Sequence, residues 1–522
     1  GWILHLNTDI LYMRNNNYTF PMKHSNFNIL PVIAAALLLF GCGGNGNKSQ
    51  VKLSPIMEKA LNEKESKFYA DFGSFPKERA KLPIGVFDSG TGGLTVLEVL
   101  LKNDMVNNVT GEDGQDGIPD LAGENFQYLA DRANMPYGNY KAAGKEDFFK
   151  ELVVKDALFL LGNKYYNNNV DSNPLGEKER VKILIIACNT ATAYGLADVE
   201  TLLSCSGTGI KVIGVINAGV RALFGGIEEQ IAAGDTRSGK NFGIGVIATA
   251  GTIASNAYQE LIAKTAGEKG IGVSISSRGA IGIAESVDME KDYVDESAVA
   301  VRDNYKGPVL GDGDGDIHES MLPLYNFNKE NNGYLEKTEN GKLVSLQLNS
   351  SENYARFHLV SLIDNYLKNG YTAPLSRIIM GCTHYPFLIN TFRQVVAEMR
   401  EYKENGEYVY KDILPDNVVF IDPAIYTAKE CAQELRKDNQ MAVSTDDSAV
   451  KAFISVPKNG LDSTKVDADG NLTYDFKYGR EYGTEDEYTV VVPFSRRYLN
   501  ETTINNIRAL LPESYKKITE TL

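Results

Sequence analysis

The chain is short of cysteine, because its 522 residues include only Cys42, Cys188, Cys205, Cys382 and Cys431. A disulfide framework is built from more cysteines in a far shorter chain, so a disulfide-rich fold is excluded. Cys205 and Cys431 have no motif around them. We expect these two to be ordinary core or surface residues.

Positive charge is also scarce, since 53 Lys and Arg stand against 68 Asp and Glu, giving a net charge of −15. No stretch gathers a basic patch that could offset this balance. A phosphate backbone would be repelled, so we expect no nucleic-acid partner. The hydrophobic content of 43% is that of a globular protein, and the length allows two or three domains.

The N-terminal region lacks an apolar run long enough to span a bilayer, because the run at residues 29–40 is too short. This run lies between Met22-Lys23-His24 and Cys42, and glycines follow at residues 43–47. The arrangement resembles a bacterial lipoprotein signal, in which the cysteine is lipidated. We expect an anchor on Cys42 and a periplasm-facing envelope location. The alternatives are a buried apolar helix and a cytoplasmic protein.

Two apolar runs end in a cysteine and share one design: ILIIACNTAT, residues 183–192, and RIIMGCTHYP, residues 377–386. Branched residues without polar alternation suit a strand buried on both faces of a parallel sheet. Open α/β sheets bind ligands just past the ends of such strands. A lone cysteine is most often a small buried hydrophobe, but two matched copies favour a site at Cys188 and Cys382.

A glycine-rich turn follows another apolar run at residues 84–96, which read IGVFDSGTGGLTV. A turn that opens a helix leaves backbone N–H groups free to hold an anion. It lacks the third glycine of a dinucleotide fingerprint, because none lies three residues after Gly92. Asp88, at the strand end, is either a helix cap or a functional carboxylate.

Four stretches together resemble the motifs of the cofactor-independent glutamate racemases. They are the glycine-rich turn, the two cysteine runs, and ADRANMPYG at residues 130–138, which is similar to the family's substrate-contacting Pro-Tyr-Gly segment. Weaker matches lie at residues 245–253 and 421–424. The likeness covers about residues 82–440, interrupted by insertions.

The resemblance implies an amino-acid racemase in which one base removes a proton from Cα and another group returns one on the opposite face. It assigns the proton of the D-enantiomer to Cys188 and that of the L-enantiomer to Cys382, with Asp88 assisting Cys188. His384 lies two residues beyond Cys382, where an imidazolium lowers a thiol pKa. Glu285 falls where a second catalytic acid is expected, although the residues around it match poorly.

Without a cofactor the carbanion has no large electron sink, so its stabilisation needs fixed hydrogen-bond donors around the carboxylate. No lysine lies in a recognisable cofactor-anchoring context, and we expect neither a cofactor nor a metal. Asp312, Asp314 and Asp316 have the opening spacing of a calcium loop, but Pro323 stands at its twelfth position. The residues expected to bind the substrate are Ser89, Pro136, Tyr137, Gly138, Asn189, Thr190, Thr192 and Thr383.

Two other functions stay open. One is a neighbouring enzyme of the same paired-cysteine fold, such as an aspartate or hydantoin racemase; Asn217-Ala218 departs from the residues that glutamate racemases usually have there. Residues 136–138 and 382–386 favour glutamate. The other is a non-catalytic envelope lipoprotein that binds amino acids. The expected partners are a small-molecule amino acid and, through Cys42, a membrane; a homodimer is compatible with the resemblance.

The resemblance predicts an α/β fold of two pseudo-symmetric three-layer α/β/α domains with mainly parallel sheets and the active site in the cleft between them. Residues 1–42 would be an upstream segment and signal, and 43–81 a tether and lead-in helix. Domain one would comprise residues 82–214 and 388–522, the latter including a C-terminal extension. Domain two would be residues 215–387.

Overall fold

The computed structural model describes residues 52–174, 176–234, 241–443, 447–484, 487–499 and 501–519. Cys42 lies outside the described residues, so the structure does not test its expected lipidation. Among the described residues, none of the helices is both long and apolar enough to cross a membrane.

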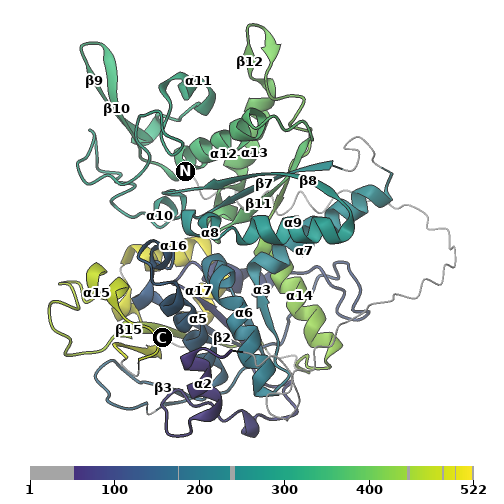
Figure 1. Cartoon of the computed structure of the whole chain (residues 1–522), viewed down its shortest axis with the longest axis vertical. Helices are drawn as coiled ribbons and strands as arrows, with labels where there is room; N and C mark the ends of the chain where they lie inside the picture. The colour runs from purple at the N-terminus through teal and green to yellow at the C-terminus, as the bar shows by residue number, and fades with distance from the viewer. Residues whose placement is uncertain are drawn as a thin grey trace. The chain divides into compact units, whose positions relative to one another are not determined.

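Two sheets organise the chain (Figure 1). The first has the order β16-β15-β2-β1-β5-β6 and the second the order β14-β11-β7-β8. The strands of the first sheet are β1 (Ile84–Asp88), β2 (Phe126–Ala130), β5 (Ile183–Ile186), β6 (Val212–Gly214), β15 (Val450–Pro457) and β16 (Thr489–Pro493). Those of the second are β7 (Asn241–Ala248), β8 (Gly272–Gly279), β11 (Leu375–Gly381) and β14 (Val419–Ile421).

The two sheets repeat one topology. In each, the first strand in sequence has the second on one side and the third, then the fourth, on the other, and these strands are parallel. The first sheet adds β15, parallel to β2, and β16, antiparallel to β15. The predicted mainly parallel α/β fold is confirmed. Cys188 and Cys382 each follow the third strand of a sheet, so they occupy corresponding positions.

Helices cover both faces of each sheet, because the alternate side chains of a buried strand point to opposite faces. On the first sheet, α3 (Leu94–Lys102), α14 (Pro423–Lys437), α16 (Glu501–Leu510) and α17 (Pro512–Thr519) pack on one face, and α2 (Pro55–Asn62), α5 (Glu146–Leu161) and α6 (Asn189–Ser206) on the other. On the second, α12 (Ser351–Lys368) and α13 (Ile389–Glu401) oppose α7 (Val215–Ala232) and α9 (Ala257–Lys269).

The remaining elements are short. The helices are α4 (Asn139–Ala142), α8 (Ala250–Ala254), α10 (Ile283–Val287), α11 (Leu322–Tyr325) and α15 (Tyr474–Gly479). The strand pairs are β3 (Lys164–Tyr165) with β4 (Gly176–Glu177), β9 (Tyr334–Glu339) with β10 (Lys342–Leu348), and β12 (Lys403–Glu404) with β13 (Glu407–Tyr408).

The strand pairing corrects one predicted boundary. We predicted that the chain returns to domain one at residue 388. Instead β14 pairs with β11 of the second sheet, where Arg377 is opposite Val419, and α13 packs on α12. The chain therefore stays with the second sheet through Ile421, and α14 then packs against α3 and α7. The lead-in helix is also shorter than predicted, because α2 ends at Asn62.

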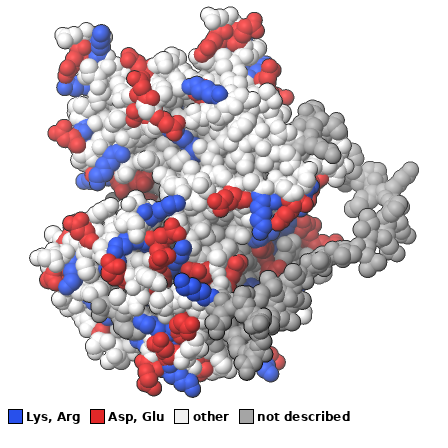
Figure 2. Space-filling view, viewed as in Figure 1, with Lys and Arg blue, Asp and Glu red and all other residues white. Residues whose placement is uncertain are grey.

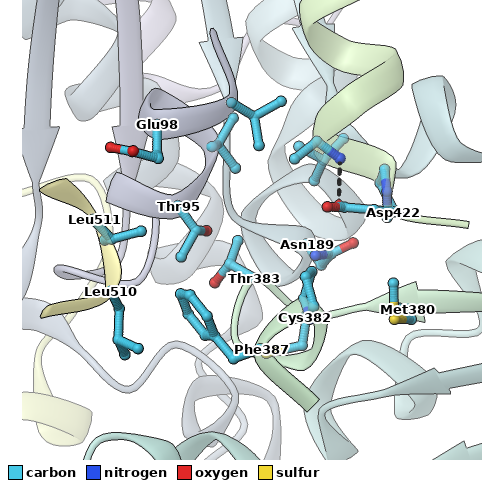
Figure 3. A pocket seen from close by; sticks show the side chains of 16 residues that line it. Thr95, Glu98, Asn189, Met380, Cys382, Thr383, Phe387, Asp422, Leu510 and Leu511 are labelled. Carbon is cyan, nitrogen blue, oxygen red and sulfur yellow. Dashed lines mark hydrogen bonds between the residues drawn. The ribbon is translucent and has the colours of Figure 1, made fainter. Parts of the chain in front are cut away.

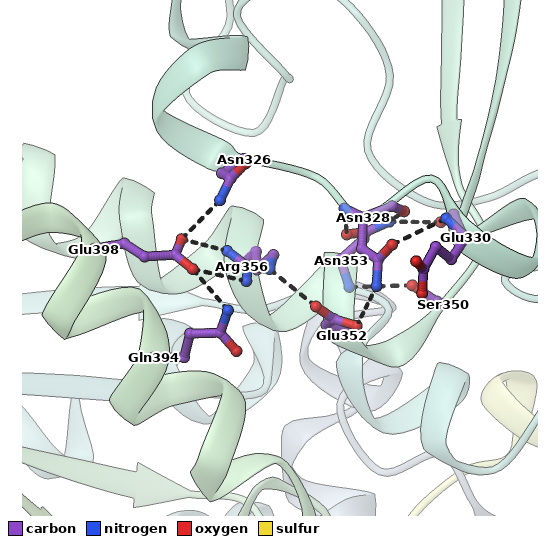
Figure 4. Close-up of polar contacts among 10 residues, drawn as sticks. Asn326, Asn328, Glu330, Ser350, Glu352, Asn353, Arg356, Gln394 and Glu398 are labelled. Carbon is purple, nitrogen blue, oxygen red and sulfur yellow. Dashed lines mark hydrogen bonds and ion pairs between the residues drawn. The ribbon is translucent and has the colours of Figure 1, made fainter. Parts of the chain in front are cut away.

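The long insertion between β8 and β11 is tied down by a polar network (Figure 4). Arg356 on α12 pairs with Glu398 on α13 at 2.7 Å and with Glu352 at 3.2 Å. The Asn353 amide donates to the Asn328 carbonyl at 2.7 Å and accepts from the Asn328 N–H at 2.8 Å. These contacts fix the segment before the β9–β10 hairpin to the helices behind the second sheet.

The acidic loop at residues 311–316 makes hydrogen bonds within itself and to Arg278. Asp316 accepts from the Gly313 N–H at 2.9 Å, and the Asp314 carbonyl accepts from Arg278 at 2.7 Å. Across the described parts of the chain, no group of three or more His, Cys, Asp or Glu could hold a metal ion. On the face drawn in Figure 2, the described acidic and basic side chains are interspersed.

Candidate active site

A cavity of about 660 Å³ is lined by residues that follow the strands of both sheets. Its walls come from the turn after β1, the start of α6, the loop before α4, and the segments after β7, β8 and β11. The predicted site residues that line it are Asp88, Ser89, Tyr137, Gly138, Cys188, Asn189, Thr190, Glu285, Cys382, Thr383 and His384. The cavity thus joins segments from distant parts of the sequence, as the resemblance implied.

Cys188 lies at the start of α6, where its sulfur accepts a hydrogen bond from the Ala191 N–H at 3.4 Å. The residue is buried, with 8% of its surface exposed. Burial raises the pKa of the Cys188 thiol, and the nearby Asp88 carboxylate raises it further. A buried thiol beside an anion keeps its proton, so Cys188 is suited to donate one.

Asp88 holds the turn before α3 and also lines the cavity. Its Oδ2 accepts from the Gly93 N–H at 2.7 Å and from the Gly90 N–H at 3.3 Å, which holds the turn that opens α3. A side chain at position 93 could not fit, because a Cβ there would lie 2.4 Å from the Asp88 Cβ. Burial raises the pKa of Asp88, and these hydrogen bonds oppose the rise. Asp88 therefore fixes the turn that precedes α3 and does not cap the helix itself, whose N-cap is Gly93, and its place in the cavity lining is compatible with a functional carboxylate.

Cys382 lies beside a histidine, whereas Cys188 lies beside a carboxylate. Its sulfur is 3.6 Å from His384 Nδ1, and His384 Nε2 is 3.1 Å from Asp288 Oδ2. Burial alone would lower the pKa of His384, but the Asp288 carboxylate and the Cys382 sulfur together raise it well above its usual value. A protonated ring therefore places positive charge beside this sulfur, whereas Cys188 faces a carboxylate.

Asp288 is the residue that sequence reasoning missed. We predicted Glu285 as the second acid, and Glu285 does line the cavity, but its carboxylate accepts from the Gly282 N–H at 3.0 Å and caps α10. Asp288, three positions later, contacts His384 instead. Residues three apart lie on one face of a helix, so a second acid at this spacing was the signal available.

The predicted substrate-binding residues divide into two groups. Asn189 and Thr190 line the cavity and also connect its walls, because Asn189 Oδ1 accepts from the Tyr258 hydroxyl at 2.7 Å and the Thr190 hydroxyl lies 3.2 Å from that of Thr252. Thr192 does not line the cavity. Its hydroxyl donates to the Cys188 carbonyl at 2.9 Å, the bond to the preceding turn that threonine often makes in helices.

Pro136 is also absent from the lining, although its neighbours Tyr137 and Gly138 are present. Gly138 lies against Gly251 of α8, where a Cβ on Gly251 would come within 2.8 Å of the Gly138 Cα. Nearby, Lys141 Nζ on α4 donates to the Ala254 carbonyl at 2.8 Å. The two walls of the cavity therefore meet at these positions.

A second, smaller cavity of about 130 Å³ also reaches Cys382 and Asn189 (Figure 3). Its lining is mainly apolar and includes Phe387, Leu510 and Leu511. Asp422 is a polar exception; its carboxylate caps α14 at the Ala424 N–H, and burial raises its pKa to about 6.

Sequence comparison places these features among known enzymes. The chain is 25% identical to a glutamate racemase of Sulfurihydrogenibium sp. (strain YO3AOP1) over 65% of this chain and 81% of that protein. It is 26% identical to a glutamate racemase of Clostridium novyi (strain NT) over 73% of this chain and 93% of that protein. These similarities indicate a racemase. No family model matches the chain.

Among solved structures, the chain is similar to a glutamate racemase from Thermus thermophilus in complex with β-chloro-D-alanine, with 20% identity and a TM-score of 0.38. That likeness covers 72% of this chain and 89% of the other. A racemase isoform from Bacillus anthracis gives the same identity and TM-score, covering 72% of this chain and 88% of the other. The sequence similarities support the predicted isomerase activity and the resemblance to glutamate racemases.

Proposed function

We propose that this racemase interconverts L- and D-glutamate without a cofactor, by proton transfer at Cα between two cysteines. The observation that carries the proposal is that Cys188 and Cys382 occupy corresponding positions. They follow corresponding strands of two sheets with the same strand order, and both line one cavity. Racemisation needs acid/base groups on opposite faces of one carbon, and two such sulfurs meet that need.

The charges beside the two sulfurs suit them to different roles in the L-to-D reaction. In the L-to-D reaction, Cys188, buried beside Asp88, acts as the acid, and Cys382, beside the positively charged His384 ring, acts as the base. Cys382 then takes the Cα proton of L-glutamate, and Cys188 delivers its own proton to the opposite face. The products are D-glutamate, a Cys382 thiol and a Cys188 thiolate, so charge and protons balance. Reaction of a D-substrate reverses these steps.

Hydrogen-bond donors replace an electron sink. Ser89, Asn189 and Thr383 line the cavity from both sheets, and the N-terminus of the 18-residue helix α6 adds its dipole beside Cys188. Fixed donors around the substrate carboxylate stabilise the negative charge that develops when the Cα proton leaves.

Lys141 supports an acidic substrate. Among the described residues that line the cavity, Lys141 is the only lysine or arginine. Its ammonium group donates a hydrogen bond to the neutral Ala254 carbonyl. A substrate carboxylate would be a stronger partner for the ammonium group, because charge-assisted hydrogen bonds exceed those to neutral acceptors.

The test is incubation of the purified, reduced protein in D₂O with a panel of L- and D-amino acids, following deuterium at Cα by mass spectrometry and optical rotation. We expect exchange and loss of optical activity with both glutamate enantiomers. Exchange confined to aspartate or hydantoins would assign the chain to the neighbouring enzymes. Tight binding of an amino acid without any exchange would mean a binding protein, and the proposal would fail.

We also propose that the mature protein is anchored through a lipid on Cys42. The support is the sequence alone: a short apolar run, the cysteine, and a glycine-rich segment after it. Expression of Cys42→Ser beside the unmodified chain in a bacterial host tests this, because only the unmodified chain should stay with salt-washed membranes. Equal retention of both would rule the anchor out.

A further inference from the structure

The insertion between β15 and β16 packs against a wall of the cavity. We call residues 474–483, which include α15 (Figure 1), the strap, and residues 134–142 the cavity loop. The cavity loop lines the cavity through Met135, Tyr137, Gly138, Asn139, Lys141 and Ala142. The strap itself contributes none of the lining residues, so its effect on the cavity must pass through the loop.

Two side chains of the strap hold consecutive carbonyls of the cavity loop. Lys477 Nζ donates to the Met135 carbonyl at 2.6 Å, and the Tyr478 hydroxyl donates to the Pro136 carbonyl at 2.9 Å. These carbonyls immediately precede Tyr137, which lines the cavity. Fixing them sets the direction in which the backbone enters the lining segment.

Arg480 holds the loop at two further points. Its guanidinium donates to Asn134 Oδ1 at 2.6 Å and to the Tyr140 hydroxyl at 3.1 Å. The ring of Tyr140 also packs edge-on against that of Tyr478, with 4.7 Å between centroids. The strap therefore contacts the loop before and within its lining segment.

A buried acidic group lies beneath the loop, close to Arg480 of the strap. The Tyr137 hydroxyl lies 2.6 Å from Asp131 and 2.8 Å from Asp156, and all three side chains are buried. One hydroxyl has one proton to donate, so one of the two carboxyls must carry its own proton. Burial and the Asp131 charge raise the pKa of Asp156 well above its usual value, which makes Asp156 the protonated one.

Asp131 then keeps a negative charge in the interior, where a charge needs a partner. Burial raises the pKa of Asp131, and the rise is opposed by hydrogen bonds from Tyr137 and from the Asn134 amide, at 2.8 Å, and by the positive charge of Arg480. Arg480 thus holds the loop and also compensates the charge that anchors Tyr137.

We propose that the strap positions the cavity loop and thereby sets the affinity of the cavity for its substrate, with Lys477, Tyr478 and Arg480 as positioning residues. This rests on the proposed function for the identity of the substrate. The strap contacts neither cysteine, so its loss should weaken binding and leave proton transfer intact.

The test compares Lys477→Met and Tyr478→Phe with the matched control Lys465→Met. Lys465 lies in the same insertion, pairs with Asp462 at 2.8 Å and lies 5.9 Å from the ring centroid of Phe476 in the strap, but it makes no hydrogen bond to the cavity loop, all of which the structure describes. For each protein we would measure kcat and KM for both glutamate enantiomers, and hydrogen exchange of residues 134–142. We expect KM to rise about tenfold in each strap variant, as the loss of a charge-assisted or buried hydrogen bond implies, with kcat nearly unchanged.

Exchange of the cavity loop should become faster in both strap variants and stay unchanged in Lys465→Met. Lys477→Arg, which keeps a donor, should restore much of the affinity. Unchanged exchange in the loop, or a fall in kcat at constant KM, would overturn the proposal. If the unmodified protein shows no turnover, the proposed function fails, while the exchange data still decide whether the strap positions the loop.

Discussion

Cys188 and Cys382 are alike in sequence context but face opposite charges. The first is buried beside Asp88, and the second lies 3.6 Å from a histidine that Asp288 keeps protonated. A two-base enzyme needs one group that holds a proton and one that lacks it at the start of each turnover. The proposed two-cysteine mechanism uses this contrast: burial and the Asp88 carboxylate keep the proton on Cys188, and the positive charge of His384 lies beside Cys382, the proposed base for the L-enantiomer.

Replacing either cysteine with serine should separate the two half-reactions. Serine is nearly isosteric but a far weaker base, so Cys188→Ser and Cys382→Ser should each lower racemisation by at least about 100-fold. Cys188→Ser should still eliminate a β-leaving group from the L-enantiomer, because only Cys382 is needed, and Cys382→Ser should show the reverse preference. Chiral chromatography of the remaining substrate measures this. Equal activity of both variants on both enantiomers would contradict the two-base assignment.

Replacing Asp288 should change the pH profile. Its carboxylate raises the pKa of His384, so the imidazolium persists above the usual range and is lost only as pH rises through the raised value. Asp288→Asn keeps an acceptor but removes the charge, and the alkaline limb of kcat/KM for L-glutamate should move to lower pH by about one unit or more. Asp292→Asn is the matched control, because Asp292 pairs with Lys306 at 2.5 Å. If the alkaline limb does not move in Asp288→Asn, the Asp288–His384 pair does not control the pH dependence of kcat/KM.

At the scale of elements, the site depends on a contact between α4 and α8, where Lys141 reaches the Ala254 carbonyl. Lys141→Met should raise KM for glutamate about tenfold, since it removes the positive charge offered to the second carboxylate. KM for a neutral amino acid that the enzyme turns over should change little. Lys141→Arg and the remote Lys150→Met, on α5, serve as controls. Equal losses for acidic and neutral substrates would show that Lys141 only holds the two elements together.

Elements differed in how well the sequence predicted them. β5 and β11 were predicted because a strand buried on both faces is an uninterrupted apolar run. The site at Cys188 and Cys382 was predicted because each cysteine comes just after such a strand. β14 has only three residues, too few to show a pattern, so the return to the first sheet was placed too early. Thr192 does not line the cavity, because its hydroxyl bonds to the preceding turn, and its motif alone did not indicate this. The hydrogen bond of Lys477 to Met135 joins segments 342 residues apart. No local pattern encodes such a contact.

At the scale of the whole molecule, a buried ion pair between Lys182 and Glu124 lies where the chain returns from the second sheet to the first. Lys182 Nζ lies 2.5 Å from Glu124 Oε2, and their side chains are 0% and 1% exposed. Lys182 also donates to the Gln440 carbonyl at 2.9 Å, and Glu124 accepts from the Ala442 N–H at 2.7 Å. The pair therefore fixes the segment after α14 beneath the first sheet.

Lys182→Met should lower the free energy of unfolding by about 3–5 kcal/mol, because it leaves the Glu124 carboxylate buried without its partner. Lys182→Met combined with Glu124→Leu should be less destabilised than Lys182→Met alone, since an apolar pair leaves no uncompensated charge. Urea denaturation followed by circular dichroism measures both. Lys337→Met, which breaks an exposed pair with Glu339, is the control and should unfold like the unmodified protein. If Lys182→Met were as mild as Lys337→Met, water would have to reach Glu124, and the return of the chain would be held by the packing of α14 on α3 and α7 rather than by this pair.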